Sequence, residues 1–315
     1  MTPLVTFIIG CTGSGKGGLG RELALRTGGE IISADSMKVY RRMDIGTAKP
    51  SPEVRRRIPH HIIDVVEPSR EFSVAEYVRL AEAAIADIQR CGRPVFVVGG
   101  TPLYVKALNE GLFEGPSADP EIRKRLQEQA TASGVGELYR RLGSVDAVAA
   151  GRIHPNDLRR IVRALEVFEL TGQPISELQT QWDRQRTRYQ CWIVGLRRSR
   201  EDQNRRTNER VRRMIEAGFV EEVKALLAEP EPLSTAARQA LGYAELIEHL
   251  HGRISLADAV EMIKINTRRF AKAQRTWFRR FLNTEWIDLQ PESTAEQVAE
   301  ELIARRDPLW TASPK

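Results

Sequence analysis

The feature that most constrains this chain is a glycine-rich run near its N-terminus, residues 10–16 (GCTGSGK). An apolar run at 4–9 precedes it, and a segment with helical spacing at 19–26 follows it. The order strand, glycine loop and helix, with Gly10, Gly15 and Lys16 at these spacings, is that of a P-loop. Backbone amides of such a loop and of the following helix attract phosphate oxygens, and Lys16 adds a positive charge. The residues expected at this anion site are Gly10, Thr12, Gly13, Ser14, Gly15 and Lys16.

The residue after this lysine departs from the P-loop pattern. That position normally carries a Ser or Thr whose hydroxyl binds Mg²⁺, but this chain has Gly17 there, followed by Gly18. Glycine offers its backbone amide to a phosphate and no side-chain oxygen to a metal. The sequence therefore supports phosphate binding and leaves the metal ligands open, with the hydroxyls of Thr12 and Ser14 as possible substitutes. A glycine turn that binds nothing is the alternative, which the strand and helix context disfavours.

Composition places the chain among ordinary soluble globular proteins. Its 315 residues are enough for a large core and a second domain or insertion. No apolar run is long enough to span a bilayer, and no signal peptide is indicated, so no membrane association is expected. Three widely spaced cysteines fit a reducing cytoplasm better than a disulfide framework. The net charge of +6 favours a polyanionic partner, and arginines are concentrated in 159–163, 184–213 and 268–280.

The order of the apolar segments predicts the fold class. Short buried strands are expected at 4–9, 30–35, 94–98, 190–196 and 286–289. Strand-like runs are missing between 114 and 190, where helical patterns occur at 119–132, 135–142 and 157–171. We therefore predict an α/β fold with a P-loop parallel-sheet core like that of nucleotide kinases. The core is expected at 1–114 and 190–315, with a helical insertion domain at 115–189 and a helical C-terminal part.

Polar residues follow two of these strands. Asp35 and Ser36 come at the end of the second strand, and Thr101 follows the strand at 94–98. Ligands of parallel sheets bind at the carboxyl ends of the strands, so these side chains are expected near the glycine loop. Asp35 can serve there as a metal ligand, a base or only a turn cap, and Thr101 as a ligand contact or a helix N-cap. His60 and His61 lack a third ligand at a recognisable spacing, so a structural role is expected for them.

Helices rich in basic residues are expected in the C-terminal half. The helix at 200–217 carries Arg206 and Arg210 four residues apart on one face, which suits a lid over an anion. A solvated surface helix is the alternative. The helix at 255–281 has an apolar face and a separate basic stripe, which favours a surface that follows a nucleic-acid backbone. A solubilising surface and a helix that lies on a membrane are the alternatives. The residues of that stripe are Lys264, Arg268, Lys272, Arg275 and Arg279.

Several motifs together resemble one enzyme family. The segments that carry the likeness are 10–16, 31–37 (IISADSM), 44–50 (DIGTAKP), 59–61 (PHH), 98–101 (VGGT), 152–157 (RIHPND), 163–167 (RALEV), 239–243 (QALGY) and 272–279. They resemble the tRNA dimethylallyltransferases, also called isopentenylpyrophosphate tRNA transferases, and the string at 44–50 is far more specific than a P-loop. The resemblance implies transfer of a dimethylallyl group from dimethylallyl diphosphate to N6 of the adenosine 3′-adjacent to the tRNA anticodon (position 37), with release of diphosphate.

The resemblance also implies roles for individual residues. The catalytic ones are Asp35, as base or positioner for the adenine amine, Thr101, as a hydrogen-bonding group, and Arg210, as a diphosphate clamp. The diphosphate-binding set, with Mg²⁺ as cofactor, is Gly10, Thr12, Gly13, Ser14, Gly15, Lys16, Gly17 and Arg206. The set implied to contact the tRNA anticodon stem-loop is Asp35, Ser36, Met37, Lys38, Thr101, Arg123, Arg159, Arg160, Arg163, Arg238, Gln239, Gly242, Tyr243, Lys272 and Arg275. The insertion is expected to grip the stem-loop, and the protein to be a cytoplasmic monomer.

Three positions depart from the family pattern. Cys11 replaces a usual proline, Lys38 stands where glutamine is common, and Gly17 replaces the hydroxyl residue. Restoring the hydroxyl with Gly17→Thr is expected to raise Mg²⁺-dependent turnover. Two rival functions remain: a P-loop nucleotide or metabolite kinase, and a non-catalytic RNA-binding protein on a P-loop scaffold, which Gly17 keeps open. The arginine-rich C-terminal helices disfavour the kinase, and the three retained catalytic residues disfavour the non-catalytic protein.

Overall fold

A computed structural model describes residues 4–112, 115–179 and 187–311 of the chain. The chain divides into two compact units. We call residues 1–109 and 187–315 the core unit and residues 110–186 the insertion unit. The sequence-based limits of the insertion, 115 and 189, lie a few residues from these edges. The units therefore meet close to where the strand-like runs of the sequence stop and resume.

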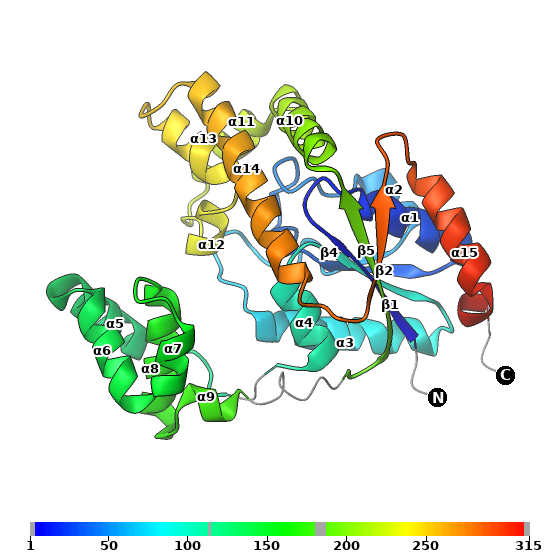
Figure 1. Ribbon diagram of the computed structural model, residues 1–315. Helices are drawn as coiled ribbons and strands as arrows, with labels where there is room; N and C mark the ends of the chain where they lie inside the picture. The colour runs from blue at the N-terminus through cyan, green and yellow to red at the C-terminus, as the bar shows by residue number, and fades with distance from the viewer. Residues whose placement is uncertain (1–3, 113–114, 180–186, 312–315) are drawn as a thin grey trace. The chain divides into compact units, whose positions relative to one another are not determined.

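One parallel sheet organises the core unit. In the part of the chain that the structure describes, six strands pair in the order β3-β2-β4-β1-β5-β6 (Figure 1). They are β1 (Leu4–Gly10), β2 (Glu30–Ala34), β3 (His60–His61), β4 (Val95–Gly99), β5 (Gln190–Arg198) and β6 (Thr284–Leu289). Every predicted strand is found, and the α/β fold class is confirmed. The short strand β3 was not predicted, because two residues carry no readable alternation.

The register of the sheet brings the polar strand ends together. Strand β1 lies between β4 and β5, and its residue Ile9 is level with Gly99 of β4. Strand β2 pairs with the other edge of β4, where Ala34 is also level with Gly99. Because the strands are parallel, the residues that follow β1, β2 and β4 leave the sheet at the same edge. The glycine loop, Asp35 and Thr101 therefore lie at one end of the sheet.

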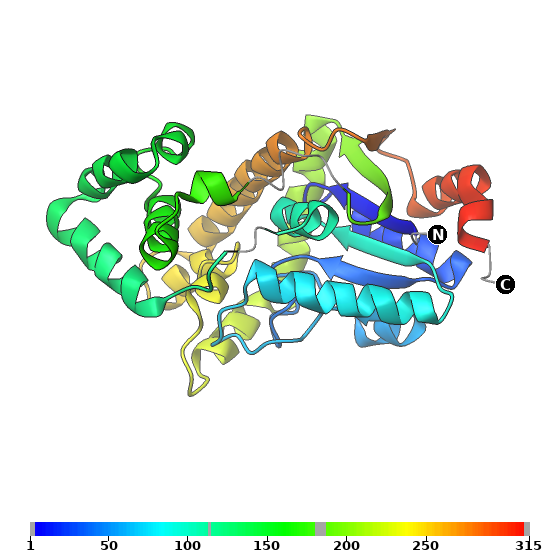
Figure 2. The same ribbon diagram turned by 90° about the horizontal axis from the view of Figure 1, so that it is seen from below.

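Helices cover both faces of the sheet. On one face α1 (Lys16–Thr27) packs against α15 (Ala295–Thr311), and on the other lies α3 (Val74–Arg90) (Figures 1 and 2). Ile8 of β1 and Val98 of β4 are buried in one cluster with Leu23 of α1. The buried strands read as continuous apolar runs because a parallel sheet is covered on both faces.

The other helices of the core unit are labelled in Figure 1 in the order of the chain. They are α2 (Pro52–Arg57), α4 (Pro102–Glu110), α10 (Arg200–Glu216), α11 (Phe219–Leu227), α12 (Thr235–Arg238), α13 (Tyr243–Leu250) and α14 (Leu256–Phe278). The predicted helices at 200–217 and 255–281 are confirmed. Helix α3 begins with a capping box between Ser73 and Glu76. Helices α11 and α13 were not predicted. Gly218 and Gly242 precede them, so neither N-cap residue offers a side chain to the first-turn amides, although Glu245 of α13 accepts a hydrogen bond from the Gly242 amide.

The insertion unit is helical, with a small core of its own. Its described helices are α5 (Pro120–Ser133), α6 (Val135–Val145), α7 (Ala147–Arg152), α8 (Leu158–Thr171) and α9 (Ile175–Leu178). Predicted segments at 119–132, 135–142 and 157–171 match α5, α6 and α8, whereas the short helices α7 and α9 were not predicted. Leu126, Leu138 and Ile161 are fully buried in this core.

One carboxylate is buried in the insertion unit. Glu166 of α8 is fully buried and accepts hydrogen bonds from Arg123 Nε at 2.8 Å and Arg163 NH1 at 2.6 Å. Burial acts to raise the pKa of Glu166, but the two arginines and the amide of Asp119 outweigh it and hold that pKa below its usual range. A buried charge without partners is strongly destabilising, so Arg123 and Arg163 have a structural role here.

Candidate active site

A cavity of about 1200 Å³ lies at the carboxyl edge of the sheet, within the core unit. Its walls are the glycine loop, the residues that follow β2 and β4, the loop at 44–52, and parts of α10 and α14. Every predicted catalytic residue, Asp35, Thr101 and Arg210, lines it together with Lys16. One cavity therefore contains the predicted phosphate site and the predicted catalytic groups.

The glycine loop has the conformation of an anion site. Gly10 has a φ of +155°, and a Cβ there would lie 2.7 Å from Ser14 Oγ, so only glycine fits. Gly15 has a φ of +101° and begins α1 without a side-chain hydrogen bond to the helix amides. The first amides of a helix have no intrahelical partner. The amides of Lys16 and Gly17 are therefore available to an anion. The Ser14 hydroxyl is instead fully buried and has no hydrogen-bond partner among the described residues.

Lys16 is held inside the loop beside Asp35. Its Nζ donates a hydrogen bond to the carbonyl of Cys11 at 3.3 Å. Burial lowers the pKa of Lys16 to about 8, and the attraction of Asp35 opposes that shift. Lys38 and Arg210 lie near enough to lower the same pKa further. Three cations thus surround one carboxylate, an arrangement that favours a polyanionic ligand.

Asp35 and Thr101 fix the strand ends to each other. Asp35 Oδ1 accepts a hydrogen bond from the Met37 amide at 3.0 Å, so the turn-capping role considered from the sequence is present. Thr101 Oγ1 accepts a hydrogen bond from the Ser36 amide at 3.0 Å, and the Thr101 amide donates to the carbonyl of Ala34. These bonds hold the Asp35 carboxylate and the Thr101 hydroxyl at the cavity wall.

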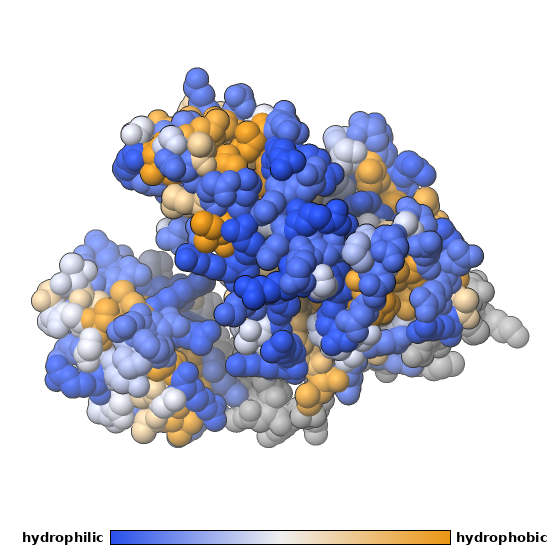
Figure 3. Space-filling view, turned by 45° about the horizontal axis from the view of Figure 1, so that its top comes forward, coloured by the Kyte–Doolittle hydropathy of each residue, from blue (hydrophilic) through white to orange (hydrophobic). Residues whose placement is uncertain are grey.

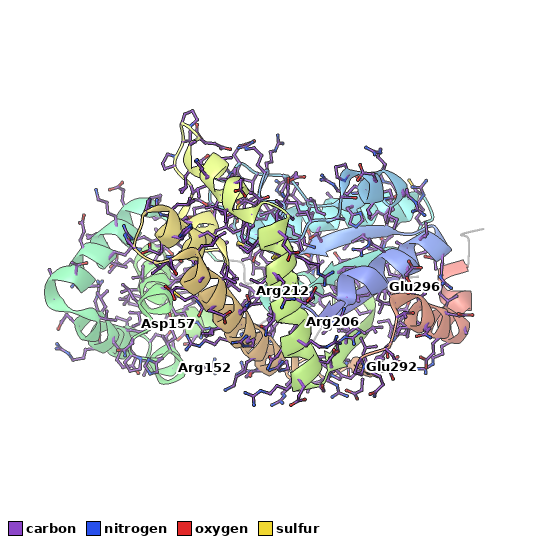
Figure 4. The ribbon with its side chains drawn as sticks, turned by 90° about the horizontal axis from the view of Figure 1, so that it is seen from above. Arg152, Asp157, Arg206, Arg212, Glu292 and Glu296 are labelled. Atoms are coloured by element: carbon purple, nitrogen blue, oxygen red, sulfur yellow. The ribbon has the colours of Figure 1, made fainter. Side chains whose placement is uncertain are left out.

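Two arginines of α10 reach the glycine loop. Arg206 Nε donates to the Gly13 carbonyl at 3.1 Å, and Arg210 NH1 donates to Thr12 Oγ1 at 3.2 Å. Arg206 and Arg212 both project from α10 in Figure 4, but Arg212 pairs with Glu209 on the same helix. Burial lowers the pKa of Arg206 and of Arg210, and Asp35 opposes the shift at Arg210. The structure therefore brings both predicted clamp residues to the loop.

Two glutamines that the sequence reasoning missed hold the loop in place. Gln274 of α14 accepts a hydrogen bond from the Thr12 amide at 2.8 Å and donates to the carbonyl of Gly100. Gln203 of α10 donates to the Thr12 carbonyl and accepts from Cys11 Sγ. Gln274 is nearly fully buried in an otherwise apolar stripe of α14. A polar residue within an apolar stripe is the signal that could have found it.

Comparison with known proteins decides the family. The family model described as IPP transferase matches residues 38–281. The chain belongs to the IPP transferase family. It is 50% identical, over 90% of its length and 92% of the relative's, to a tRNA dimethylallyltransferase of Geobacter metallireducens.

Two solved structures of this family resemble the chain over nearly its whole length. A tRNA isopentenylpyrophosphate transferase from Bacillus halodurans has a TM-score of 0.70 and 37% identity, with 98% of each chain covered. A eukaryotic dimethylallyltransferase acting on tRNA has a TM-score of 0.82 and 27% identity, with 99% of this chain and 81% of that one covered.

In this IPP transferase the family-specific string at 44–50 is held by one glutamate. Glu222 of α11 accepts hydrogen bonds from the amides of Asp44 at 2.9 Å, Ile45 at 2.7 Å and Gly46 at 3.2 Å. The hydroxyl of Tyr243 donates to the same carboxylate at 2.6 Å. Burial and Glu222 both raise the pKa of Tyr243. The strings at 44–50 and 239–243 are thus two parts of one cavity wall.

A buried arginine ties the glycine loop of the IPP transferase to the C-terminal segment. Arg198, at the end of β5, donates to the Ser14 carbonyl at 3.2 Å and to the Gln290 carbonyl at 2.7 Å. Its charge is paired with Asp202 at 2.9 Å, and both side chains are almost fully buried.

Thr207 Oγ1 is buried without a hydrogen-bond partner among the described residues, and Thr207 lines the cavity. Neither Arg198 nor Thr207 was predicted.

The predicted tRNA contacts of this IPP transferase are spread over both units. Those that line the cavity are Asp35, Ser36, Met37, Lys38, Thr101, Gln239 and Tyr243. On the core unit Arg238 and Lys272 are exposed and Arg275 is partly buried, whereas Gly242 and Tyr243 are buried. On the insertion unit Arg159 and Arg160 are exposed. Hydrophilic residues dominate the face of the core unit seen in Figure 3, with smaller apolar patches between them.

Proposed function

We propose that this chain transfers a dimethylallyl group from dimethylallyl diphosphate to N6 of the adenosine at position 37 of tRNA and releases diphosphate. The observation that carries the proposal is that Asp35 and Lys16 of the glycine loop line one cavity. The two side chains lie close enough for the Asp35 charge to oppose the lowering of the Lys16 pKa. A phosphate cradle and a carboxylate that can accept a proton are the two groups that this reaction needs. Family membership supports the same function.

The cradle serves the departing diphosphate. As the bond between C1 of the dimethylallyl group and the diphosphate oxygen breaks, the electron pair and a growing negative charge go to that oxygen. The amides of the loop, Lys16 and Arg210 are fixed donors around this charge, and fixed donors stabilise a transition state more than water does. Arg206, bonded to the Gly13 carbonyl at 3.1 Å, flanks the same anion.

Asp35 and Thr101 serve the adenine. The N6 nitrogen forms the new bond to C1, and its proton passes to the carboxylate of Asp35, which acts as the general base. The Thr101 hydroxyl, 3.4 Å from Ser36 Oγ, is the hydrogen-bonding group beside it. An adenine stacked within an RNA loop is out of reach of these groups, so the base must turn out of its stack into the cavity.

The anticodon stem-loop is the part of tRNA that we propose is bound. The exposed arginines Arg159 and Arg160 of the insertion unit, and Arg238, Lys272 and Arg275 of the core unit, supply positive charge for its phosphates. The proposal includes a monomer that works in the cytoplasm. Among the helices of residues 4–112, 115–179 and 187–311, we find none that is both long and apolar enough to cross a membrane.

The donors that this chain offers do not fit a protein-held Mg²⁺. Gly17 has no side-chain oxygen, and the described residues contain no group of three His, Cys, Asp or Glu side chains that would hold a metal. The Thr12 hydroxyl already accepts a hydrogen bond from Arg210. Mg²⁺ prefers carboxylates together with substrate phosphates and water, and Asp35 is the carboxylate beside the glycine loop. The prediction of Mg²⁺ as cofactor stays a prediction, and no step above depends on it.

Mass spectrometry of tRNA tests the function. Purified protein is incubated with unmodified tRNA and dimethylallyl diphosphate, and the anticodon-loop nucleotides are weighed. We expect one adenosine, that at position 37, to gain one dimethylallyl group. Lys16→Met is the matched inactive variant, because it removes the charge while keeping an unbranched side chain. An unchanged tRNA mass would contradict the proposal, and ATP consumption without tRNA would favour the kinase instead.

A further inference from the structure

Gly17 offers no side-chain ligand to a metal, and it also leaves space beside the phosphate site. Outside the nearby backbone of its own helix, a Cβ built on Gly17 would meet only Arg21 NH1 within 4 Å, at 3.6 Å. Gly17 also has an ordinary φ, so this residue is not required by backbone strain. The side chain that occupies the neighbourhood of position 17 is therefore that of Arg21, one helical turn further along α1.

Helix geometry directs Arg21 toward the glycine loop. Residues i and i+4 lie on the same face of a helix, and their side chains lean toward its N-terminus. A long side chain at position 21 therefore runs back along α1 over Gly17, toward the helix end that attracts anions. Arg21 lines the same cavity as Lys16 and Asp35. Its guanidinium is thus a cation at the site where a P-loop usually holds its metal.

The charge of Arg21 has no partner among the residues that the structure describes. Among the described residues Arg21 takes part in no hydrogen bond or ion pair, although Glu22 beside it pairs with Arg26 at 3.5 Å. Lys38 also lacks a hydrogen bond or ion pair from its Nζ to any described residue. Arg21 lies close enough to Lys38 to lower its pKa, adding to the larger effect of burial and opposed by Asp35. Arg21 and Lys38 thus face one cavity with no hydrogen bond or ion pair to a described residue, and the two charges repel each other unless an anion binds between them.

We propose that Arg21 and Lys38 together take the place of the divalent metal in binding the diphosphate, so that this chain binds dimethylallyl diphosphate without a metal. The inference rests on the proposed function and adds to it a mode of charge neutralisation. Arg21 supplies a planar pair of donors to phosphate oxygens, and Lys38 supplies a point charge. The missing hydroxyl at Gly17 and the two cations Arg21 and Lys38 then act together at one phosphate site.

Calorimetric titration of dimethylallyl diphosphate, without tRNA, tests the proposal with and without metal. The wild-type dissociation constant in EDTA is expected to lie within about threefold of that in Mg²⁺. Arg21→Gln is expected to weaken binding in EDTA by about tenfold to a hundredfold, the loss of charge-assisted hydrogen bonds. Arg26→Gln is the matched control, because it removes the same charge from the same helix outside the cavity, and it is expected to bind like wild type.

A second variant restores the metal ligand. In the double variant Gly17→Thr with Arg21→Gln, Mg²⁺ is expected to strengthen binding by more than about tenfold, because the hydroxyl can again ligate it. Wild-type binding that depends on Mg²⁺ by more than about tenfold would overturn the inference and leave the proposed function standing. So would equal affinities of Arg21→Gln and Arg26→Gln in EDTA. Absence of binding by the wild type even in Mg²⁺ would instead overturn the proposed function, and this inference with it.

Discussion

Raising the pH from 7 to 9 is expected to weaken the binding of dimethylallyl diphosphate through one residue, Lys16. Burial lowers the pKa of Lys16 to about 8, and its neighbours Asp35, Lys38, Arg210 and Cys11 face the same space. With that pKa, the protonated fraction falls from about nine-tenths at pH 7 to about one-tenth at pH 9, so the dissociation constant should rise about tenfold. A bound diphosphate favours the protonated lysine, so binding at pH 8 should also take up protons, which calorimetry in buffers of different ionisation enthalpy measures.

The same pKa makes a prediction for stability. The pKa of Lys16 in the folded chain lies below its ordinary value of 10.5, so the unfolded chain binds more protons between about pH 8 and 10.5. The contribution of Lys16 to the free energy of unfolding should therefore rise with pH across that window. Urea denaturation of wild type and Lys16→Met gives this contribution as a difference. Lys38→Gln should keep the pH dependence of binding, since its site keeps Lys16. A dissociation constant that stays constant between pH 7 and 9 would refute the reasoning.

Three further changes test how the site is held together. Gln274→Leu leaves the Thr12 amide and the Gly100 carbonyl without this partner, so it should destabilise the core by about 1 to 3 kcal/mol and weaken diphosphate binding in calorimetry. Glu222→Ala removes the acceptor of three amides in the loop at 44–46 and should lower the free energy of unfolding by about 2 to 4 kcal/mol in urea, with prenyl transfer reduced. The pKa of Glu166 is lowered, so the stabilisation of the folded state by this carboxylate is present above about pH 4.5 and is lost as the pH falls. Glu166→Gln should remove this acid sensitivity, which circular dichroism measures as unfolding at low pH.

The sequence predicted the structure best where apolar residues recur with the known period of a strand or a helix. Every described strand except β3, the long helices α10 and α14, and the glycine loop were predicted because alternation, helical spacing and glycine placement are written in adjacent residues. Asp35 and Thr101 were found by one further rule, that parallel strands end at the same edge. Helices α11 and α13 were missed because glycine precedes each of them and offers no side-chain cap.

The residues that support the site could not be read from the chain. Gln203 and Gln274 reach the glycine loop from positions 192 and 262 residues away, and a glutamine on a helix carries no local sign of its partner. Arg198 and Glu222 are likewise ordinary charged residues until the fold buries or orients them.

The sequence by itself determined the P-loop core and the family, and it supplied the reacting groups that we propose, because these depend on residue type at fixed short spacings. The tertiary structure alone decided which cations face the cavity. In the sequence Arg21 and Arg26 are two arginines of one helix. In the fold Arg26 pairs with Glu22, whereas Arg21 extends over Gly17 into the cavity. Charge depends on residue type, but its effect depends on distance and burial, which only the packed chain sets.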